Sequence, residues 1–349
     1  MNKINTAIIG FGVSGSVFHA PFLHTHNGFE LIKIVERHTE NSKKIYPYVE
    51  IVRDYKALLK DKSIELIAIC TPNSLHFSMA KACLKAGKHI IIEKPFTVTA
   101  KEADELIKIS KKTKKKIFVY HNCRWDGDFM TIKNIIDKNI LGDIYEFEAH
   151  FDRYRPEISP EKWREQKLPG SGIVYDLGAH LIDQALLIFG KPNSLKTDIQ
   201  AQREGSIVDD YFRIELNYRE TKVILTAGML VENHDLRYIV KGHKGTFKKS
   251  GIDPQEAALK ERAMPVGEDW GKEAKEFWGL MDAVINREHC LCHIESQKGN
   301  YMSFFDNVYD VLINDAEIAV KPEQARNVIK IIELAFLSAK ENGKIITIR

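Results

Sequence analysis

The sequence predicts two domains, a doubly wound α/β domain followed by an α+β domain with an open, mainly antiparallel sheet. The chain has 349 residues, which is room for two cores. Short apolar runs alternate with amphipathic stretches up to about Tyr120, and longer alternating segments follow Gly142. This change in the hydrophobic pattern places a domain boundary between residues 1–121 and residues 122–349.

The first domain is predicted from five β-rich runs separated by helical patterns. The alternation of strand and helix is typical of a parallel sheet. Runs that are almost continuously apolar suit strands that are buried on both faces. The five runs are AIIG (7–10), ELIKIVE (30–36), IELIAIC (64–70), HIIIEK (89–94) and KIFVY (116–120).

The second domain is predicted from segments in which apolar and polar residues alternate, the pattern of an antiparallel sheet with one open face. These segments are 144–154, 209–218, 221–230 and 236–242. A final amphipathic helix is predicted over 322–343, after Pro322 and up to Gly343. Its apolar stripe must be buried, and the first domain is one candidate surface for it.

Composition excludes several classes of protein. Lys and Arg total 51 against 48 for Asp and Glu, so the formal charge of +3 gives no field that would attract nucleic acid or an anionic membrane. No segment has the roughly 18 consecutive apolar residues of a membrane span, and the amino terminus lacks the pattern of a signal peptide. Five cysteines, an odd number, argue against a disulfide framework. We therefore expect a cytoplasmic protein that acts on a small molecule.

A glycine-rich turn follows the first strand. Gly10-Phe11-Gly12-Val13-Ser14-Gly15 has the spacing Gly-x-Gly-x-x-Gly between a strand and a helix. The first glycine permits the tight turn, the second lets a pyrophosphate approach the backbone, and the third allows the helix to pack closely on the strand. Glu36 ends the second strand 21 residues later, near the offset at which an acidic residue meets the ribose hydroxyls. These features predict a dinucleotide site.

The pair Glu36-Arg37 bears on the choice of dinucleotide. A carboxylate accepts hydrogen bonds from the ribose of NAD and repels the 2′-phosphate of NADP, whereas an arginine can pair with that phosphate or cover the adenine. The pair therefore leans slightly to NAD and leaves NADP open. A third interpretation, in which Arg37 is only a solvated charge, also stays open.

Two further strand ends carry polar residues. Thr71, Pro72, Asn73 and His76 follow the run 64–70, and Glu93-Lys94-Pro95 ends the run 89–94. Ligands of open α/β sheets bind at the carboxyl ends of the strands, so both segments should face the nicotinamide. For His76, a purely structural role in a turn is an equal alternative. Lys94 can donate a hydrogen bond to a substrate hydroxyl.

An acid and a histidine share one face of a predicted helix in the second domain. Asp176 and His180 are four residues apart, so both project from the same side about one turn apart. Histidine exchanges protons near neutral pH, and a neighbouring carboxylate can orient it. A structural pair on the packing side of the helix is the alternative.

The segments SVFHAPF (16–22), TPNSLH, EKPFTVTAKEADEL, HNCRWDGDF and GSGIVYDLGAHLIDQAL together resemble the Gfo/Idh/MocA family of NAD(P)-dependent sugar and polyol oxidoreductases, particularly its scyllo-inositol dehydrogenase-like branch. The resemblance implies a catalytic lysine at Lys94 and a catalytic pair at Asp176 and His180. It also implies a homodimer or homotetramer formed through the second-domain sheet. Asn122 is expected to contact the cofactor. Related sequences often have arginine where this chain has Cys123, so the contacts of that arginine are in doubt.

Candidate substrate-binding residues are aromatic or arginine side chains, which suit hydroxyl-rich or anionic ligands. Surface or core roles remain as alternatives for each of them. They are Arg124, Trp125, Arg153, Tyr154, Arg155, Trp163 and Arg164.

Two clusters are not interpreted as sites. His289, Cys290, Cys292 and His293 are too close in sequence for the usual paired spacing of a zinc site, so no metal is expected. The basic run 111–116 lacks the interleaved aromatic residues of a nucleic-acid surface, and its cations suit a helix end.

The predicted reaction transfers a hydride between a nicotinamide cofactor and a secondary alcohol or ketone of a sugar, inositol or related polyol. His180 would accept the hydroxyl proton, Lys94 would hydrogen-bond the same oxygen, and Asp176 would position both the substrate and His180. A nucleotide- or sugar-sensing regulator of the same fold is the alternative.

Overall fold

The computed structural model describes residues 3–233 and 235–348, which divide into two compact units. Of the described residues, the first unit comprises 3–122, 255–270 and 300–327. The second comprises 123–233, 235–254, 271–299 and 328–348. The first segment of the first unit thus ends within one residue of the expected boundary, and two later segments return to that unit.

The first unit contains a six-stranded parallel sheet in the order β3-β2-β1-β4-β5-β6. This order reverses between β1 and β4, which is the topological switch point where ligands of such sheets bind. The strands span Ile4–Ile9 (β1), Phe29–Val35 (β2), Glu50–Val52 (β3), Leu66–Ile69 (β4), His89–Glu93 (β5) and Ile117–Tyr120 (β6). Strands β4 and β6 are buried throughout, as expected for strands covered on both faces.

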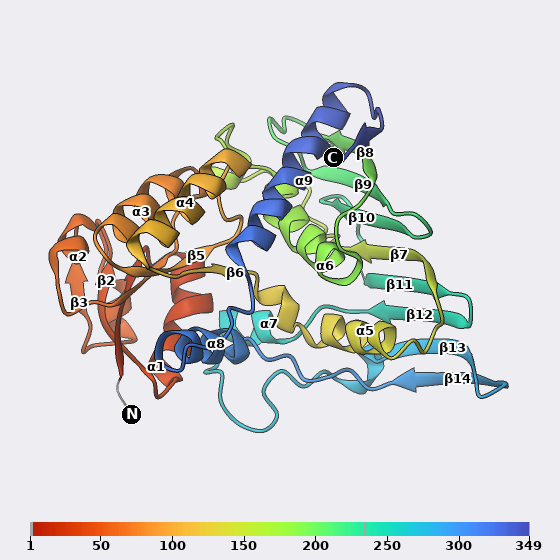
Figure 1. Cartoon of the computed structure of the whole chain (residues 1–349), viewed down its shortest axis with the longest axis horizontal. Helices are drawn as coiled ribbons and strands as arrows, with labels where there is room; N and C mark the ends of the chain where they lie inside the picture. Colours follow the sequence, from red (N-terminus) through yellow and green to blue (C-terminus); the bar gives the residue numbers. More distant parts are fainter. Residues whose placement is uncertain (1–2, 234, 349) are drawn as a thin grey trace. The chain divides into compact units, whose positions relative to one another are not determined.

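Helices cover this sheet, and α3 packs on both β5 and α4 (Figure 1). Helix α4 begins with a complete capping box, in which Thr99 accepts from the Glu102 N–H and Glu102 accepts from the Thr99 N–H. The helices of this unit are α1 (Ala20–Thr25), α2 (Lys56–Lys60), α3 (Asn73–Lys85), α4 (Ala100–Thr113), α7 (Gln255–Lys260), α8 (Met302–Ile313) and the first turn of α9 (Pro322–Lys340). A π-helical turn, Ser14–His19, precedes α1.

The second unit contains a nine-stranded sheet in the order β14-β13-β12-β11-β7-β10-β9-β8-β15. Only the pair β7 and β10 is parallel, and the other pairs are antiparallel. The strands are β7 (Ile144–His150), β8 (Ser194–Gln200), β9 (Tyr211–Asn217), β10 (Lys222–Gly228), β11 (Leu236–Gly242), β12 (Gly245–Ser250), β13 (Gly279–Ile285), β14 (Glu288–Ile294) and β15 (Ile346–Thr347).

Helices α5 (Gly127–Asp137) and α6 (Ala179–Phe189) lie on one side of this sheet (Figure 1). The chain enters α6 through a π-helical turn, Val174–Gly178. The later part of α9 also packs in this unit, where Thr197 on β8 donates to the Ala335 carbonyl at 2.8 Å.

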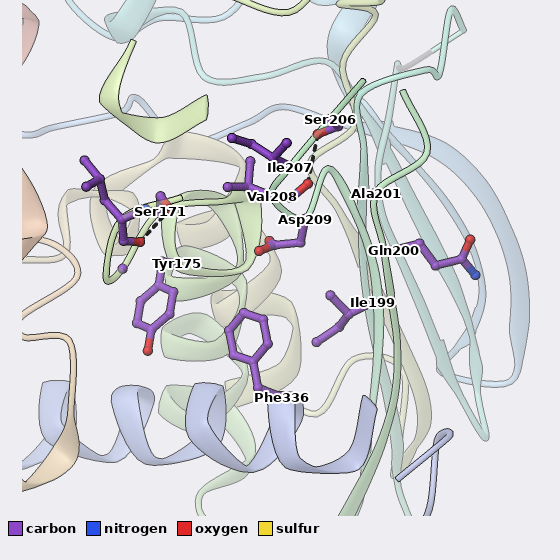
Figure 2. Close-up of a pocket in the computed structure, with 12 residues that line it drawn as sticks. Ser171, Tyr175, Ile199, Gln200, Ala201, Ser206, Ile207, Val208, Asp209 and Phe336 are labelled. Atoms are coloured by element: carbon purple, nitrogen blue, oxygen red, sulfur yellow. Dashed lines mark hydrogen bonds between the residues drawn. The ribbon is translucent and has the colours of Figure 1, made fainter. Parts of the chain in front are cut away.

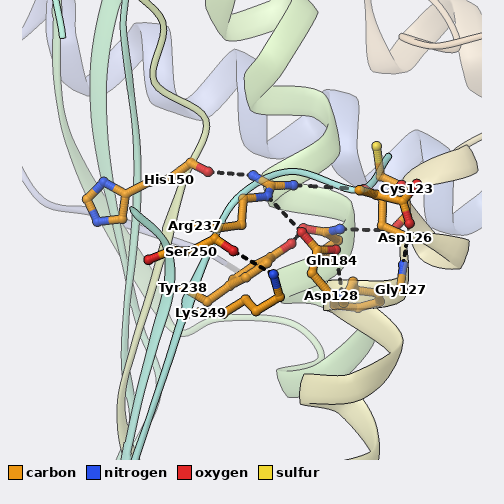
Figure 3. Close-up of polar contacts among 12 residues, drawn as sticks. Cys123, Asp126, Gly127, Asp128, His150, Gln184, Arg237, Tyr238, Lys249 and Ser250 are labelled. Atoms are coloured by element: carbon orange, nitrogen blue, oxygen red, sulfur yellow. Dashed lines mark hydrogen bonds and ion pairs between the residues drawn. The ribbon is translucent and has the colours of Figure 1, made fainter. Parts of the chain in front are cut away.

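A buried polar network fastens α5 and α6 to the sheet (Figure 3). Arg237 on β11 is 1% exposed; it donates to the His150 carbonyl, and its Nε lies 3.3 Å from an Asp128 oxygen. The Tyr238 hydroxyl donates to Gln184 of α6 at 2.8 Å. Because an unpaired buried charge is costly, these groups fix the packing of helix on sheet.

The expected elements leave out several that the structure contains, among them the helices α5 and α8 and the strands β8 and β12. Strand β3 has only three residues and was not predicted, and the hairpin β13–β14 was also missed. The last helix begins at Pro322 as predicted and ends at Lys340. Within the residues that the structure describes, no helix combines the length and hydropathy needed to cross a membrane.

Candidate cofactor and catalytic site

The three glycines of the turn after β1 have different surroundings. Gly10 has φ +93°, and a Cβ there would lie 2.7 Å from the Cys70 carbonyl oxygen. A Cβ at Gly15 would lie 2.1 Å from the Gly10 oxygen. At Gly12 a Cβ would meet nothing within 4 Å. The protein itself therefore requires glycine at positions 10 and 15, whereas the space beside Gly12 is left open.

This open space fits a dinucleotide. It lies at the end of β1, beside the switch point between β1 and β4, and the π-helical turn Ser14–His19 starts immediately after it. Backbone N–H groups at such a turn are suited to a pyrophosphate. Val13 is 64% exposed at this position, and the ring of Phe11 contacts Tyr46 edge-on at 6.4 Å between ring centroids.

The contacts of Glu36 differ from the expected contact with ribose hydroxyls. Its carboxylate accepts hydrogen bonds from the Thr39 hydroxyl at 2.5 Å, the Asn41 N–H at 2.9 Å and the Ser42 N–H at 2.8 Å. Burial alone would raise the pKa of Glu36, but the hydrogen bonds from Ser42, Thr39 and Asn41 lower it. With the side chain 4% exposed, the carboxylate stabilises its own loop, and little of it is available to ribose hydroxyls.

The residues next to Glu36 are exposed. Arg37, His38 and Thr39 follow it on the surface of the loop after β2. Arg53 holds this loop in place, because its guanidinium donates to the carbonyls of Glu36 at 2.9 Å and Thr39 at 2.6 Å. The loop therefore presents a cation, Arg37, on a fixed backbone.

His76 is a structural link between two of the predicted segments. Its ring is fully buried, with Nδ1 2.9 Å from the Pro95 carbonyl and Nε2 2.9 Å from the Thr71 carbonyl. Burial lowers the pKa of His76 despite these two carbonyls. It was expected to contact the cofactor; with a backbone carbonyl against each ring nitrogen, it instead lies between the turn after β4 and the segment after β5. Asn73, the first residue of α3, is also buried.

Glu93 joins the glycine turn to Lys94. One carboxylate oxygen accepts from the Ser14 hydroxyl and lies 2.8 Å from His19 Nε2, and the other accepts from the Lys94 N–H at 3.1 Å. Burial would raise the pKa of Glu93, but His19, Ser14 and Lys94 lower it, so the group is a carboxylate. The Lys94-Pro95 peptide bond is cis. This carboxylate thus fixes the backbone of the candidate catalytic lysine relative to the candidate pyrophosphate turn.

Sequence reasoning missed the role of His19. The ring is fully buried against Tyr120, with 4.4 Å between centroids. Burial would lower its pKa, but interactions with Cys70 and Glu93 raise it to about 10, so the imidazolium pairs with Glu93. A histidine in the first turns after a glycine motif, on the side facing the sheet, was the available signal.

Asp176 and His180 lie on consecutive turns in the second unit. Asp176 belongs to the π-helical turn, and its Oδ1 lies 3.3 Å from Arg164 Nε. His180 is 8% exposed, and its ring lies 6.1 Å from that of Phe151. Arg164 therefore pairs with Asp176. Lys94 belongs to the first unit.

The other candidate substrate residues separate into two groups. Arg124 is 8% exposed, and its guanidinium forms a bidentate pair with Asp183 of α6, with both distances 2.7 Å. This pairing differs from the expected substrate contact, because Asp183 already binds the Nε and Nη2 groups of Arg124. Cys123 is buried beside it. The other candidates are exposed or half-buried: Trp125, Arg153, Tyr154, Arg155 and Trp163. Asn122 is 7% exposed at the end of the first segment of its unit.

The His289–His293 segment forms the edge strand β14, which is largely exposed. In the part of the chain that the structure describes, no three His, Cys, Asp or Glu side chains are placed to hold a metal ion.

The glycine turn gives a matched pair of variants. Gly15→Ala should lower the free energy of unfolding by about 1–3 kcal/mol, because the new Cβ displaces the Gly10 backbone. Gly12→Ala should leave stability within about 0.5 kcal/mol and weaken NADPH binding at least about tenfold, since the methyl group fills space that the protein leaves open. Urea unfolding and fluorescence titration with NADPH measure the two effects. Equal NADPH affinity in Gly12→Ala and wild type would contradict this assignment.

Comparison with known proteins gives a consistent result. The family model described as oxidoreductase family, NAD-binding Rossmann fold, matches residues 4–121, and the one described as oxidoreductase family, C-terminal alpha/beta domain, matches residues 133–347. The chain is 40% identical to the uncharacterized oxidoreductase YdgJ of Escherichia coli, over 98% of each chain. It is 37% identical to scyllo-inositol 2-dehydrogenase (NADP(+)) IolW of Bacillus subtilis, over 99% of this chain and 96% of that protein.

Solved structures show the same likeness. The oxidoreductase yvaA of Bacillus subtilis superposes with a TM-score of 0.96 at 37% identity, covering 100% of this chain and 99% of that one. The oxidoreductase YPO2259 of Yersinia pestis gives 0.93 at 37% identity, covering 100% and 98%. The predicted family and fold are confirmed: the chain is an NAD(P)-binding oxidoreductase of the Gfo/Idh/MocA family.

Proposed function

We propose that the protein interconverts a secondary alcohol and a ketone of a sugar, inositol or related polyol, with Lys94, Asp176 and His180 as its catalytic residues. The observation that carries this proposal is the attachment of Lys94 to the glycine turn through Glu93. It holds the candidate donor at the strand end where the nicotinamide is expected. The B. subtilis relative named as a scyllo-inositol 2-dehydrogenase supports the substrate class.

Each residue has a distinct task in the oxidation direction. Bound nicotinamide supplies the acceptor for the hydride that leaves the alcohol carbon. The imidazole of His180 takes the hydroxyl proton, and the ammonium of Lys94 donates a hydrogen bond to the same oxygen as it becomes a carbonyl. Asp176 orients His180 and binds a neighbouring hydroxyl, while Arg164 holds one oxygen of Asp176. In the reduction direction His180 returns the proton.

We also propose that NADP is preferred, a revision of the lean to NAD that rested on Glu36. The Glu36 carboxylate accepts hydrogen bonds from three donors of its own loop. Both its repulsion of a 2′-phosphate and its binding of ribose hydroxyls are therefore weakened. Arg37 is exposed on the same loop and suits a phosphate. The relative IolW is named for NADP(+).

We propose that copies of the chain associate through the open face of the nine-stranded sheet. Leu280, Val284 and Leu291 are exposed at the β13–β14 end of the sheet, with exposed fractions of 38%, 48% and 62%. Charged pairs such as Lys241 with Glu146 and Lys222 with Glu215 lie on the middle strands. Exposed apolar side chains beside charged pairs on one sheet face suit a subunit interface. Sedimentation of the wild type and of Leu291→Glu tests this assignment.

A polyol panel tests the reaction itself. Wild-type protein should form NADPH with at least one inositol or sugar, and His180→Ala should lower kcat about 10²- to 10⁴-fold with little change in NADPH affinity. Lys94→Met should act similarly, because it keeps the apolar stem and removes the donor. Arg219→Ala, an exposed change, is the control. Tight NADPH binding without turnover of any substrate would instead indicate the sensing role.

The cofactor preference is tested at Arg37. Wild type should have the higher kcat/KM with NADP, and Arg37→Ala should lower that value by about tenfold, equivalent to about 1.4 kcal/mol, with little change for NAD. Measurement of both cofactors on wild type, Arg37→Ala and the Arg219→Ala control gives the ratios. A wild type that prefers NAD, or an unchanged ratio in Arg37→Ala, would contradict the proposal.

A further inference from the structure

The Asp209 side chain lies against the start of the helical segment that carries Asp176 and His180. Its Oδ2 accepts a hydrogen bond from the Val174 N–H at 2.7 Å, and its backbone carbonyl accepts one from Ile173 at 3.1 Å. Val174 is the first residue of the π-helical turn that continues into α6. Asp209 belongs to another part of the chain, the loop before β9, so it fixes this helix start from outside.

Gly172 is shaped to admit the Asp209 side chain. It has φ +83°, and a Cβ there would lie 2.0 Å from Asp209 Oδ1 and 2.5 Å from its Cγ. Any other residue at 172 would expel the carboxylate. The Gly172 carbonyl also accepts from the Asp176 N–H at 3.2 Å. The Asp209 side chain lies against Gly172 and binds the Val174 N–H, and the Gly172 carbonyl binds the Asp176 N–H. Asp209 is therefore linked to Asp176 through the backbone of this turn.

The loop that carries Asp209 is itself anchored. The next residue, Asp210, is 1% exposed and accepts from the Gln202 N–H at 2.6 Å and from Arg203 Nε at 3.0 Å. Arg203 also pairs with Glu165 at 2.7 Å, next to Arg164. Because Asp209 extends from this fixed loop, it can hold the helix start at one position.

The Asp209 carboxylate also borders a cavity of about 480 Å³ (Figure 2). Tyr175 and Phe336 line it, stacked with 5.8 Å between their centroids, together with Ile199 and Val208. Burial raises the pKa of Asp209 to about 6, so the side chain is mostly an anion at pH 7.5. An anion is favourable at the amino end of a helix. A small carboxylate could enter this cavity if the Asp209 side chain were removed.

We propose that Asp209 is a positioning residue: by binding the Val174 amide in the space left by Gly172, it sets the orientation of Asp176 and His180 for the reaction. This inference rests on the proposed function. No sequence motif indicated Asp209, because it lies in the loop before β9, far along the chain from the helical segment that carries Asp176 and His180.

Steady-state kinetics at pH 7.5 on the full-length protein tests the proposal. Asp209→Ala should lower kcat at least about tenfold, with the dissociation constant of NADPH unchanged. Asp209→Asn should recover most of the activity, because its amide oxygen still accepts from Val174. Sodium formate should restore part of the kcat of Asp209→Ala, with sodium chloride at equal ionic strength as the control. Asp137→Ala, which removes an exposed carboxylate of α5, should behave as wild type.

Two results would overturn the proposal. One is a kcat of Asp209→Ala equal to that of wild type. The other is a loss of kcat that neither the asparagine variant nor formate recovers. If wild type oxidises no polyol, the proposed function fails, and hydrogen exchange of the amides of residues 173–180 decides the role of Asp209. Faster exchange in Asp209→Ala than in wild type would support positioning, and equal exchange would overturn it.

Discussion

The carboxylate of Glu93 is the group on which the arrangement of the first unit depends. It is buried at the end of β5, and it binds the Ser14 hydroxyl, the His19 ring and the Lys94 N–H. An ionised buried carboxylate needs several donors. Those donors come from the glycine turn and from the candidate catalytic lysine, so the need to satisfy one charge aligns two functional segments. His76 adds a second link between the ends of β4 and β5.

The second unit follows the same physical rule. Arg237, Asp128, Lys249 and Glu273 are buried as oppositely charged partners, and Arg124 pairs with Asp183 on α6. Burial raises the pKa of Glu273, although Lys249 and Ser296 act to lower it. Removal of one partner would leave the other unpaired, so Arg237 with Asp128 favours a single packing of α5, and Arg124 with Asp183 favours a single packing of α6.

Much of this architecture could be predicted from sequence because its signals are local. The glycine spacing fixed the position of the turn after β1, continuous apolar runs indicated the buried parallel strands, and Pro322 marked the start of α9. Strand β3 was missed because three residues show no period, and β14 because its alternation is mostly polar. The orientation of Glu36 depended on donors three to six residues away, which an offset rule does not include. Asp209 was missed because its partner lies 35 residues earlier in the chain.

The role of Glu93 in aligning the glycine turn with Lys94 is tested by one measurement. NADPH affinity and kcat/KM on the best polyol should be determined for Glu93→Gln, with Glu65→Gln as a control in the same unit and circular dichroism to verify folding. We expect both quantities to fall at least about tenfold in folded Glu93→Gln, because a neutral amide cannot accept from all three donors. NADPH affinity and kcat/KM equal to those of wild type would contradict the claim that this carboxylate aligns the glycine turn with Lys94.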